Sequence, residues 1–373
     1  MEPVFLAKQT DYSAEALDAA VAGAFAALSL DALVRPGMRV VIKPNLVMRS
    51  KSEAGIITHP AVTAAVGRRV KALGAQVMIA ESPGGLYSPS VMKSTYAYCG
   101  YTAMAEENGF ELYTQCRYRE VDVPDGQRCR QFTLLEPFLE ADLIIDIAKM
   151  KTHGMTLFSG AVKNLFGTVP GLMKPELHCR FPEKQAFSEM LVDLCSFLAP
   201  TISIMDGITA MEGNGPTGGS PRFVGLFGAS KSPYALDAVC CRVIGLDPME
   251  VLMLQNARQR GLLSEDVEVL GTPVEELRVT DFKMPDTKSV DFITHLPGPL
   301  RPLATKLTTP YPKIPRSKCV GCGRCAESCP AHTIVIEKGK AVIHREKCIR
   351  CFCCHEMCPQ HIVEIRRFAL FNL

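Results

Sequence analysis

Two cysteine runs near the end of the chain constrain its fold more than any other feature. They contain Cys319, Cys322, Cys325 and Cys329, then Cys348, Cys351, Cys354 and Cys358. Each run has the spacing C-x2-C-x2-C-x3-C-P, and a shift of 29 residues superimposes one on the other, so they form an internal repeat. This spacing is typical of bacterial modules that bind two iron–sulfur clusters.

The last cysteine of each run is expected to bind the cluster of the other run, as this spacing implies. We therefore predict two [4Fe-4S] clusters, one held by Cys319, Cys322, Cys325 and Cys358 and the other by Cys348, Cys351, Cys354 and Cys329. Structural zinc is the alternative, but it would leave four of the eight cysteines without a role. The gap of 22 residues between the two candidate zinc pairs, Cys322/Cys325 and Cys348/Cys351, also exceeds the usual zinc-ribbon spacing.

Two features between and within the runs lead to further predictions. Residues 333–336 and 340–344 flank Lys338-Gly339, which predicts a β-hairpin. Its apolar side chains are expected to pack beneath the clusters, and they are Ile334, Ile336, Val342 and Ile343. Cys353 lies beside a predicted ligand but outside the repeat, and it is expected to be a thiol that binds no cluster.

Length and composition indicate two or three domains with packed cores, because the chain has 373 residues of which 47% are hydrophobic. Eight of the sixteen cysteines are not predicted cluster ligands, and several of them lie among apolar neighbours, which favours a reducing compartment over disulfides. No basic segment precedes an apolar run at the N-terminus, and no stretch approaches the roughly eighteen apolar residues of a membrane span. We expect a cytoplasmic protein from an organism with anaerobic habits.

The net charge of +2 is unevenly distributed along the chain. From residue 313 onward, eleven Lys and Arg residues outnumber five Asp and Glu residues. A basic rim of this kind would steer an acidic ferredoxin to the module, and a merely solvated surface is the alternative. Nucleic acid is not an expected partner, because aromatic residues are only 7%, Trp is absent and the basic residues do not alternate with stacking rings.

Before the cysteine runs, buried strands alternate with amphipathic helices. Strands are predicted at 39–42, 76–80, 142–147, 201–205 and 223–229, and helices at 60–73, 89–107, 157–166, 183–198 and 232–245. This alternation predicts an α/β domain with a mostly parallel sheet covered by helices on both faces, followed by a small α+β ferredoxin-like domain. The predicted boundaries are 1–280 for the α/β domain, 281–312 for a Pro-rich linker and 313–373 for the cluster domain.

Polar side chains gather after two of the predicted strands, where α/β sheets bind ligands. Lys149, Lys151 and His153 follow the strand 142–147, with Lys163-Asn164 a few residues on. Lysines and a histidine around glycine turns would hold a carboxylate or phosphate group, and a solvated basic loop is the alternative.

The second group lies in the glycine-rich segment 206–219, which is expected to be a mobile lid or a backbone cradle. Asp206 and Glu212 within it offer oxygen ligands or general bases, and His178 could join either group. A plain connection is the alternative for the loop, and a satisfied structural residue is the alternative for His178. The segment matches no dinucleotide, P-loop or EF-hand pattern.

Several of these segments together resemble one known family. They are Lys43-Pro44-Asn45-Leu46, Thr58-His59-Pro60, Lys149-Met150-Lys151-Thr152-His153, residues 160–167, residues 211–216 and residues 235–239. In this order they resemble the family of domain of unknown function 362, several members of which carry a C-terminal two-cluster ferredoxin module. The resemblance implies no settled substrate, but it marks the lysine–histidine segment and the Glu212 segment as signature segments, where rigid sheets position functional loops.

Two functions follow from these predictions. The first is an iron–sulfur reductase that receives electrons from a ferredoxin or similar donor and passes them through both clusters to an anionic small molecule or a second cofactor. Lys149, Lys151 and Lys163 would bind the anion, His153 or His178 would supply a proton, and Asp206 or Glu212 would act as base or metal ligand. The second is an electron-transfer adaptor or cluster carrier whose α/β domain binds a partner protein through an exposed patch, where the reductase would have a closed pocket.

Overall fold

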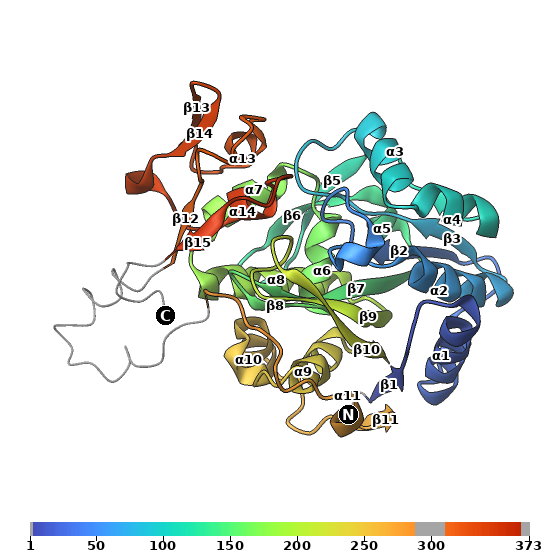
Figure 1. Ribbon diagram of the computed structural model, residues 1–373. Coiled ribbons are helices and arrows are strands. Elements are labelled where there is room, and N and C mark those ends of the chain that lie inside the picture. The colour runs from blue at the N-terminus through green and yellow to red at the C-terminus, as the bar shows by residue number, and fades with distance from the viewer. Residues whose placement is uncertain (1–2, 288–309, 367–373) are drawn as a thin grey trace.

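The computed structural model describes residues 3–287 and 310–366, and its larger part is one mixed sheet (Figure 1). Within the described residues, nine strands form this sheet in the order β11-β1-β10-β9-β7-β2-β3-β4, with β8 paired to β7. These strands are β1 (Val4–Lys8), β2 (Arg39–Pro44), β3 (Gln76–Ile79), β4 (Glu111–Leu112), β7 (Leu143–His153), β8 (Leu157–Ser159), β9 (Ile202–Glu212), β10 (Ser220–Ser230) and β11 (Val269–Gly271). β9, β7, β2, β3 and β4 run parallel, whereas β10 is antiparallel to β9 and β1.

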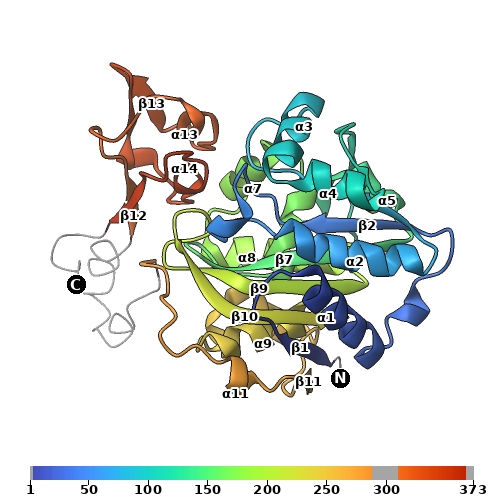
Figure 2. The ribbon, with the colours of Figure 1, turned by 45° about the vertical axis from the view of Figure 1, so that its right-hand side comes forward.

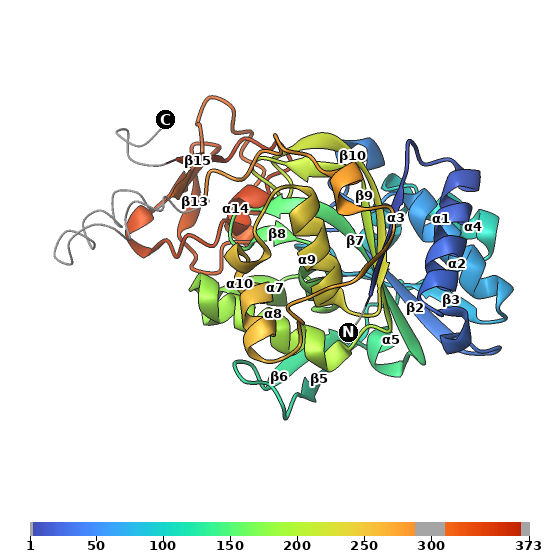
Figure 3. The ribbon, with the colours of Figure 1, turned by 90° about the horizontal axis from the view of Figure 1, so that it is seen from below.

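Helices cover both faces of the sheet, as the view from below in Figure 3 shows. One face packs against α1 (Ala14–Ala27), α2 (Pro60–Ala72), α3 (Pro89–Tyr98) and α4 (Tyr101–Asn108). The other packs against α6 (Ala161–Asn164), α8 (Lys184–Leu198), α9 (Pro233–Val243) and α10 (Leu252–Gln259). Ile144 and Ile145, neighbours on β7, belong to different cores because successive strand residues point to opposite faces. The predicted α/β class is confirmed.

Shorter elements complete the α/β part of the chain. A separate hairpin pairs β5 (Tyr118–Asp122) with β6 (Gln131–Leu135). The remaining short helices are α5 (Glu136–Glu140), α7 (Met173–Arg180) and α11 (Val274–Leu277). No helix of the described residues has the length and apolar character needed to cross a membrane.

The strand predicted to end at residue 147 is longer than expected, because β7 continues to His153. Its extension is held by β8, which pairs antiparallel with it through Lys151 and Ser159. The helix predicted over 157–166 is therefore wrong in its first part, and α6 begins only at Ala161, where the Asp237 carboxylate accepts bonds from the first backbone N–H groups. A side chain at Gly160 would collide with that carboxylate. Consequently Lys149, Lys151 and His153 lie within a rigid buried strand and not in a loop.

The glycine-rich segment also differs from the expected mobile loop. Residues 206–212 belong to β9, and β10 pairs with them in register from Ser220 opposite Glu212. Only residues 213–219 form the connection between the two strands. The extension forms because the segment that follows it, Ser220–Ser230, supplies a full antiparallel partner, which local composition does not reveal.

The cysteine-rich module is a small unit beside the β9–β10 connection and α7 (Figures 1 and 2). It contains α13 (Arg324–Glu327), α14 (Cys353–Glu356), and two strand pairs, β12 (Tyr311–Lys313) with β15 (Glu364–Arg366) and β13 (Ile334–Glu337) with β14 (Lys340–Ile343). The predicted hairpin is confirmed, and its turn places Lys338 and Gly339 at positive φ, as a type I′ turn requires. Ile334 is buried in the module core, but Ile336 is 41% exposed, so its predicted place beneath the clusters is wrong.

The predicted linker, residues 281–312, lies mostly outside the described residues. Its described beginning follows the α/β domain, where the backbone N–H of Lys283 donates to Glu212 Oε2 at 3.1 Å. Its described end enters β12, where Pro312 is opposite Ile365 of β15.

Candidate active site between the sheet and the cysteine-rich module

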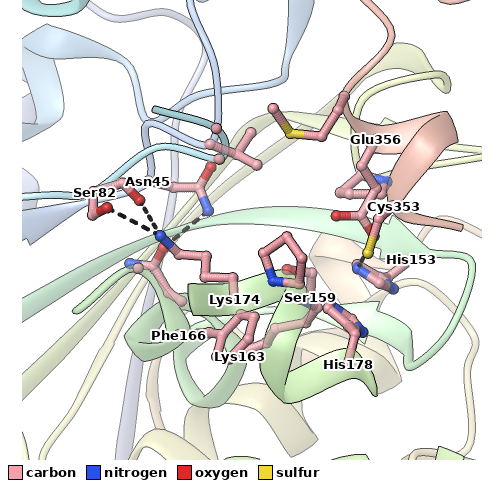
Figure 4. A pocket seen from close by; sticks show the side chains of 18 of the residues that line it. Asn45, Ser82, His153, Ser159, Lys163, Phe166, Lys174, His178, Cys353 and Glu356 are labelled. Carbon is pink, nitrogen blue, oxygen red and sulfur yellow. Dashed lines mark hydrogen bonds and ion pairs between the residues drawn. The ribbon is translucent and has the colours of Figure 1, made fainter. Parts of the chain in front are cut away.

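A cavity of about 80 Å³ lies between the α/β domain and the module (Figure 4). On one side it is lined by residues at or after the carboxyl ends of β2, β3 and β7, together with α6 and α7. These include Asn45, Ser82, Lys151, His153, Lys163, Lys174 and His178. On the other side it is lined by module residues Ser328, Cys353, Glu356 and Met357. The cavity therefore lies at the sheet edge where α/β folds bind ligands.

Lys151 extends from β7 toward the end of β2, and its side chain is buried. Its Nζ donates to Asn45 Oδ1 at 2.9 Å and to the carbonyl oxygen of Ile56 at 2.8 Å. Burial, together with the charge of Lys163, lowers the pKa of Lys151 to about 7. Ammonium and amine forms are thus both populated near neutral pH, as a proton donor at that pH requires.

Asn164 fixes the position of Asn45 from the end of α6. Asn45 Nδ2 donates to Asn164 Oδ1 at 2.9 Å, and Asn164 Nδ2 donates to Asp146 Oδ1 at 2.7 Å. Asn45 is thereby held with its own oxygen toward Lys151. Asn164 lines the cavity, and its hydrogen bonds support the other lining residues.

Two further lysines line the cavity, from α6 and α7. Lys174 Nζ donates to Ser82 O at 2.7 Å and to Ser82 Oγ at 3.2 Å, and burial lowers its pKa to about 7. Lys163 Nζ lies 5.3 Å from the ring centroid of Phe166, and burial also lowers its pKa. In their protonated forms, three lysines outnumber Glu81 and Glu356, the two carboxylates among the described lining residues, and so favour an anionic ligand.

His153, the last residue of β7, contacts the module directly. Its Nδ1 accepts from the backbone N–H groups of Met155 and Thr156, so the ring proton of the neutral form is on Nε2. That Nε2 lies 3.0 Å from Glu356 Oε1. Burial and the charge of Lys163 lower the pKa of His153 to about 4, so the ring is neutral at pH 7. Burial alone would raise the pKa of Glu356, but His153 and Lys163 bring it below its ordinary value.

His178 on α7 also lines the cavity, as Figure 4 shows. Its ring stacks on Phe187 with 4.2 Å between centroids and meets Phe166 edge-on at 5.8 Å. Burial lowers the pKa of His178 to about 3, so it is neutral at pH 7. Its Nδ1 has no hydrogen-bond partner among the described residues, which leaves it available to a ligand.

The other three residues of the predicted site do not line the cavity. Lys149 and Asp206 form a buried ion pair at 2.9 Å, and Tyr12 contacts both groups at 3.0 Å. Glu212 accepts the bond from the backbone of Lys283. The structure thus brings Lys151, His153, Lys163, Asn164 and His178 together and places Lys149, Asp206 and Glu212 elsewhere.

Sequence reasoning missed several lining residues, among them Ser82, Lys174, Cys353 and Glu356. Two of them carried a signal. Cys353 is an extra thiol within the second cysteine run, and Glu356 is the only acidic residue in that run. The predicted role of Cys353 as a thiol without a cluster leaves it free to face the cavity. Ser82 and Lys174 are distant in sequence, and only the tertiary fold reveals their contact.

The cysteines predicted to hold the first cluster lie around one small hollow in the module. Cys319, Cys322, Cys325 and Cys358 all line it. Backbone N–H groups of Gly321 and Ala341 donate to Cys319 Sγ at 3.4 and 3.3 Å, as hydrogen bonds to cluster sulfurs do. Cys358 comes from the second run, so the two runs meet here.

In the second predicted set, Cys329 of the first run lies near Cys348 of the second run. Burial raises the pKa of Cys348, and the nearby charges of Cys351 and Cys329 add to this. Cys329 comes from the first run, and its Sγ accepts from the backbone N–H of Thr333 at 3.3 Å. Among the described residues, no group of three or more His, Cys, Asp and Glu could hold a metal ion. A cluster differs from a single ion because each thiolate binds its own iron corner, so the four sulfurs need not converge on one point.

Further contacts, besides that of His153 with Glu356, join the module to the α/β domain around the cavity. Thr217 Oγ1 donates to the carbonyl oxygen of Glu356 at 3.0 Å, and His355 Nε2 lies 2.9 Å from the carbonyl oxygen of Asn214. Met357 packs on Gly84, where a Cβ would lie 2.4 Å from its sulfur. The β9–β10 connection and the segment after β3 thus hold the module against the sheet edge.

Residues 311–359 match the family described as a 4Fe-4S dicluster domain. Together with the two cysteine sets, this match defines an iron–sulfur protein of the electron-transfer class. Residues 40–242, more than half of the chain, match the domain of unknown function DUF362. The chain belongs to the DUF362 family, and here a 4Fe-4S module follows that domain.

One curated relative and one solved structure are similar to the chain. The thylakoid-associated protein sll1697 of Synechocystis sp. is 34% identical over 275 residues, which are 69% of this chain and 80% of that protein. The lactate racemase apoprotein of Thermoanaerobacterium thermosaccharolyticum is 13% identical, with a TM-score of 0.39. That likeness covers 65% of this chain and 56% of the racemase.

Proposed function

We propose that this protein is a reductase that delivers electrons through two [4Fe-4S] clusters to an anionic small molecule in the cavity. The observation that carries the proposal is the composition of the cavity wall. One side presents three lysines, and the other presents Cys353 and Glu356 of the cysteine-rich module. Cys353 lies between Cys351 and Cys354 in sequence, so the second cysteine set adjoins the bound molecule.

Two sets of four cysteines would hold the clusters. The first is Cys319, Cys322, Cys325 and Cys358, and the second is Cys348, Cys351, Cys354 and Cys329. When bound, such clusters supply electrons one at a time at potentials tuned by hydrogen bonds to their sulfurs. The bonds from Ala341 N to Cys319 and from Thr333 N to Cys329 are two of these.

In this proposal the lysines have two roles, which are ligand binding and proton donation. Lys163 and Lys174 would bind the anionic group by charge and hydrogen bonding. Lys151 would supply the proton, because its pKa of about 7 leaves both of its forms populated near neutral pH. His153 and His178, the proton donors favoured by sequence, have pKa values near 4 and 3 and are neutral at pH 7. His178 Nδ1 would instead accept a hydrogen bond from the ligand.

The adaptor alternative needs an exposed patch where a partner protein can bind. Lys151, His153, Asn164 and His178 are instead buried around an internal space. A small molecule fits such a space and a protein surface does not, which favours the reductase.

The proposal also includes the cellular setting. All sixteen cysteines are free in the structure, as in a reducing compartment such as the cytoplasm. A ferredoxin or similar carrier would be the electron donor.

Purification without air followed by mass analysis of bound small molecules tests this function. The wild-type protein should carry an anionic compound that the Lys151→Met/Lys163→Met variant has lost. Lys8→Met/Lys93→Met, which changes two exposed lysines outside the cavity, is the matched control and should retain the compound. The proposal fails if the cavity variant retains the same compound at the same stoichiometry.

A further inference from the structure

A second hollow lies on the outer side of the module and is distinctly basic. It is an open hollow of about 480 Å³, lined by β12, β14, β15 and the residues around them. Lys313, Arg316, Arg345 and Arg366 line it, and among the described residues Glu364 is the one acidic residue of its lining. Glu364 is paired with Arg366 at 2.7 Å, so it neutralises only one of the four cations. We call this hollow the basic groove.

The basic groove adjoins the first cysteine set and not the second. Ile314 and Ala341 line both the groove and the hollow that contains Cys319 and Cys322. Cys322 is exposed, unlike Cys319, Cys325 and Cys358 of the same set. Val320, two residues before it, is 62% exposed and gives this edge an apolar contact point. The first cysteine set therefore has an open edge beside the cations.

The active-site cavity and the basic groove lie beside different cysteine sets. The cavity is lined by Cys353, which lies among the ligands of the second set, whereas the groove borders Cys319. Electron transfer between proteins requires close approach of a cofactor edge, and weak redox complexes use small charged interfaces. A carrier at the groove would reach the first set without entering the cavity.

We propose that the basic groove and Val320 are the docking surface for a small acidic electron-carrier protein of the ferredoxin class. The inference deepens the proposed function and rests on its assignment of the first cluster. Cys319, Cys322, Cys325 and Cys358 would hold the cluster next to this surface, and that cluster would accept one electron from the docked, reduced carrier. The carrier is oxidised, the module is reduced by the same single electron, and no proton or bond is exchanged.

Charge complementarity selects an acidic partner over a neutral one. Four cations against one paired carboxylate attract a negatively charged surface and raise the association rate by about tenfold or more at low salt. The attraction falls off at high ionic strength, because the Debye length shrinks to about 3 Å at 1 M salt. The exposed Val320 supplies the apolar centre that such weak interfaces contain.

The test uses the anaerobically purified full-length protein with both cluster sites loaded and a reduced acidic bacterial ferredoxin as the probe. Binding is measured by titration, and electron uptake is followed by bleaching of cluster absorption. The docking variant is Lys313→Glu/Arg316→Glu, and the matched control is Lys93→Glu/Arg119→Glu on the exposed surface of the α/β domain. Reduced methyl viologen, a small cation that needs no docking site, serves as a second reductant.

At low salt, the docking variant should bind ferredoxin roughly tenfold more weakly and be reduced by it roughly tenfold more slowly. The control should bind ferredoxin and be reduced by it as wild type is. Methyl viologen should reduce the docking variant and the control at least as fast as it reduces wild type, which shows that their clusters are intact. Wild-type uptake from ferredoxin should fall with added salt until it meets that of the variant. Equal ferredoxin affinities for docking variant and wild type at low salt would overturn the proposal, as would no salt dependence.

One further outcome distinguishes a ferredoxin docking site from a general site for polyanions. Binding of single-stranded DNA as tight as that of ferredoxin would overturn the proposal in favour of a general polyanion site. Because neither readout uses the small molecule of the cavity, the docking surface can be confirmed even if the reductase proposal fails, and the reverse also holds.

Discussion

His153 Nε2 on β7 lies 3.0 Å from Glu356 Oε1 on α14 of the cysteine-rich module. The contact joins the last residue of β7, a strand that is buried throughout, to the helix that contains Cys354 of the second cysteine set. It also closes the cavity between them, because both side chains line it. The charge of Glu356 thus acts on the lysines that would bind and protonate the ligand.

Replacing Glu356 by Gln should shift the pH dependence of the reaction. Its carboxylate raises the pKa values of Lys151 and Lys163 against the effect of burial. Without that charge, Lys151 should lose its proton at lower pH, and the fall in rate should move down by roughly half a unit to one unit. The measurement is the rate at which the compound found by mass analysis reoxidises the reduced protein. Glu337→Gln, on the exposed hairpin, should leave the profile unchanged.

The wild-type rate itself should depend on the protonation of Lys151. Its pKa is lowered from 10.5 to about 7, and the ammonium form is the donor. The rate should therefore be flat below about pH 7 and fall about tenfold per pH unit above it. Lys151→Met should be slow and free of this transition between pH 6 and pH 9. A wild-type profile that stays flat through pH 9 would remove Lys151 from the donor role.

The exchange of cysteines between the runs can be tested by iron content. Wild-type protein should contain about eight iron atoms, and Cys322→Ser or Cys358→Ser should each contain about four. Because Cys322 and Cys358 serve one cluster, the Cys322→Ser/Cys358→Ser variant should also contain about four. Cys322→Ser/Cys329→Ser affects both clusters and should contain almost none. If each run keeps its own fourth cysteine, Cys322→Ser/Cys329→Ser should contain about four iron atoms and Cys322→Ser/Cys358→Ser almost none.

Cys353→Ser should leave both clusters in place. Its thiol lines the cavity, whereas the neighbouring Cys354 belongs to a cysteine set. Iron and sulfide content should therefore match wild type in Cys353→Ser and fall by about half in Cys354→Ser. Loss of iron from Cys353→Ser would make this residue a ligand.

The sequence predicted well those features that depend on local spacing. The repeat of Cys319 and Cys348, the turn at Lys338-Gly339 and the alternation of strands and helices are all local patterns. They correctly indicate a 4Fe-4S module, a hairpin and an α/β sheet. The same alternation indicates which strand ends meet at one edge, and hence why Lys151 and His153 were candidates.

Long-range pairing explains what the sequence did not reveal. Lys149 and Lys151 lie two apart on β7, yet Lys149 pairs with Asp206 of β9 and Lys151 with Asn45 after β2. The extension of β7 to His153 depends on its pairing with β8. Lys174 is held at the cavity by its hydrogen bond to Ser82. Glu356 enters the site only because the module docks there. Apart from β8, which follows β7 after three residues, none of these partners is close in sequence, so no local pattern could identify them.

Single-turnover reoxidation tests the central claim most directly. The protein is reduced with dithionite, freed of excess reductant and mixed anaerobically with the anionic compound recovered from the cavity. The account predicts that cluster absorption returns in wild type and in Lys8→Met/Lys93→Met, with the reduced compound formed in proportion, and that Lys151→Met/Lys163→Met stays reduced. Equal reoxidation of the cavity variant and wild type, or binding of the compound without any return of absorption, would contradict it.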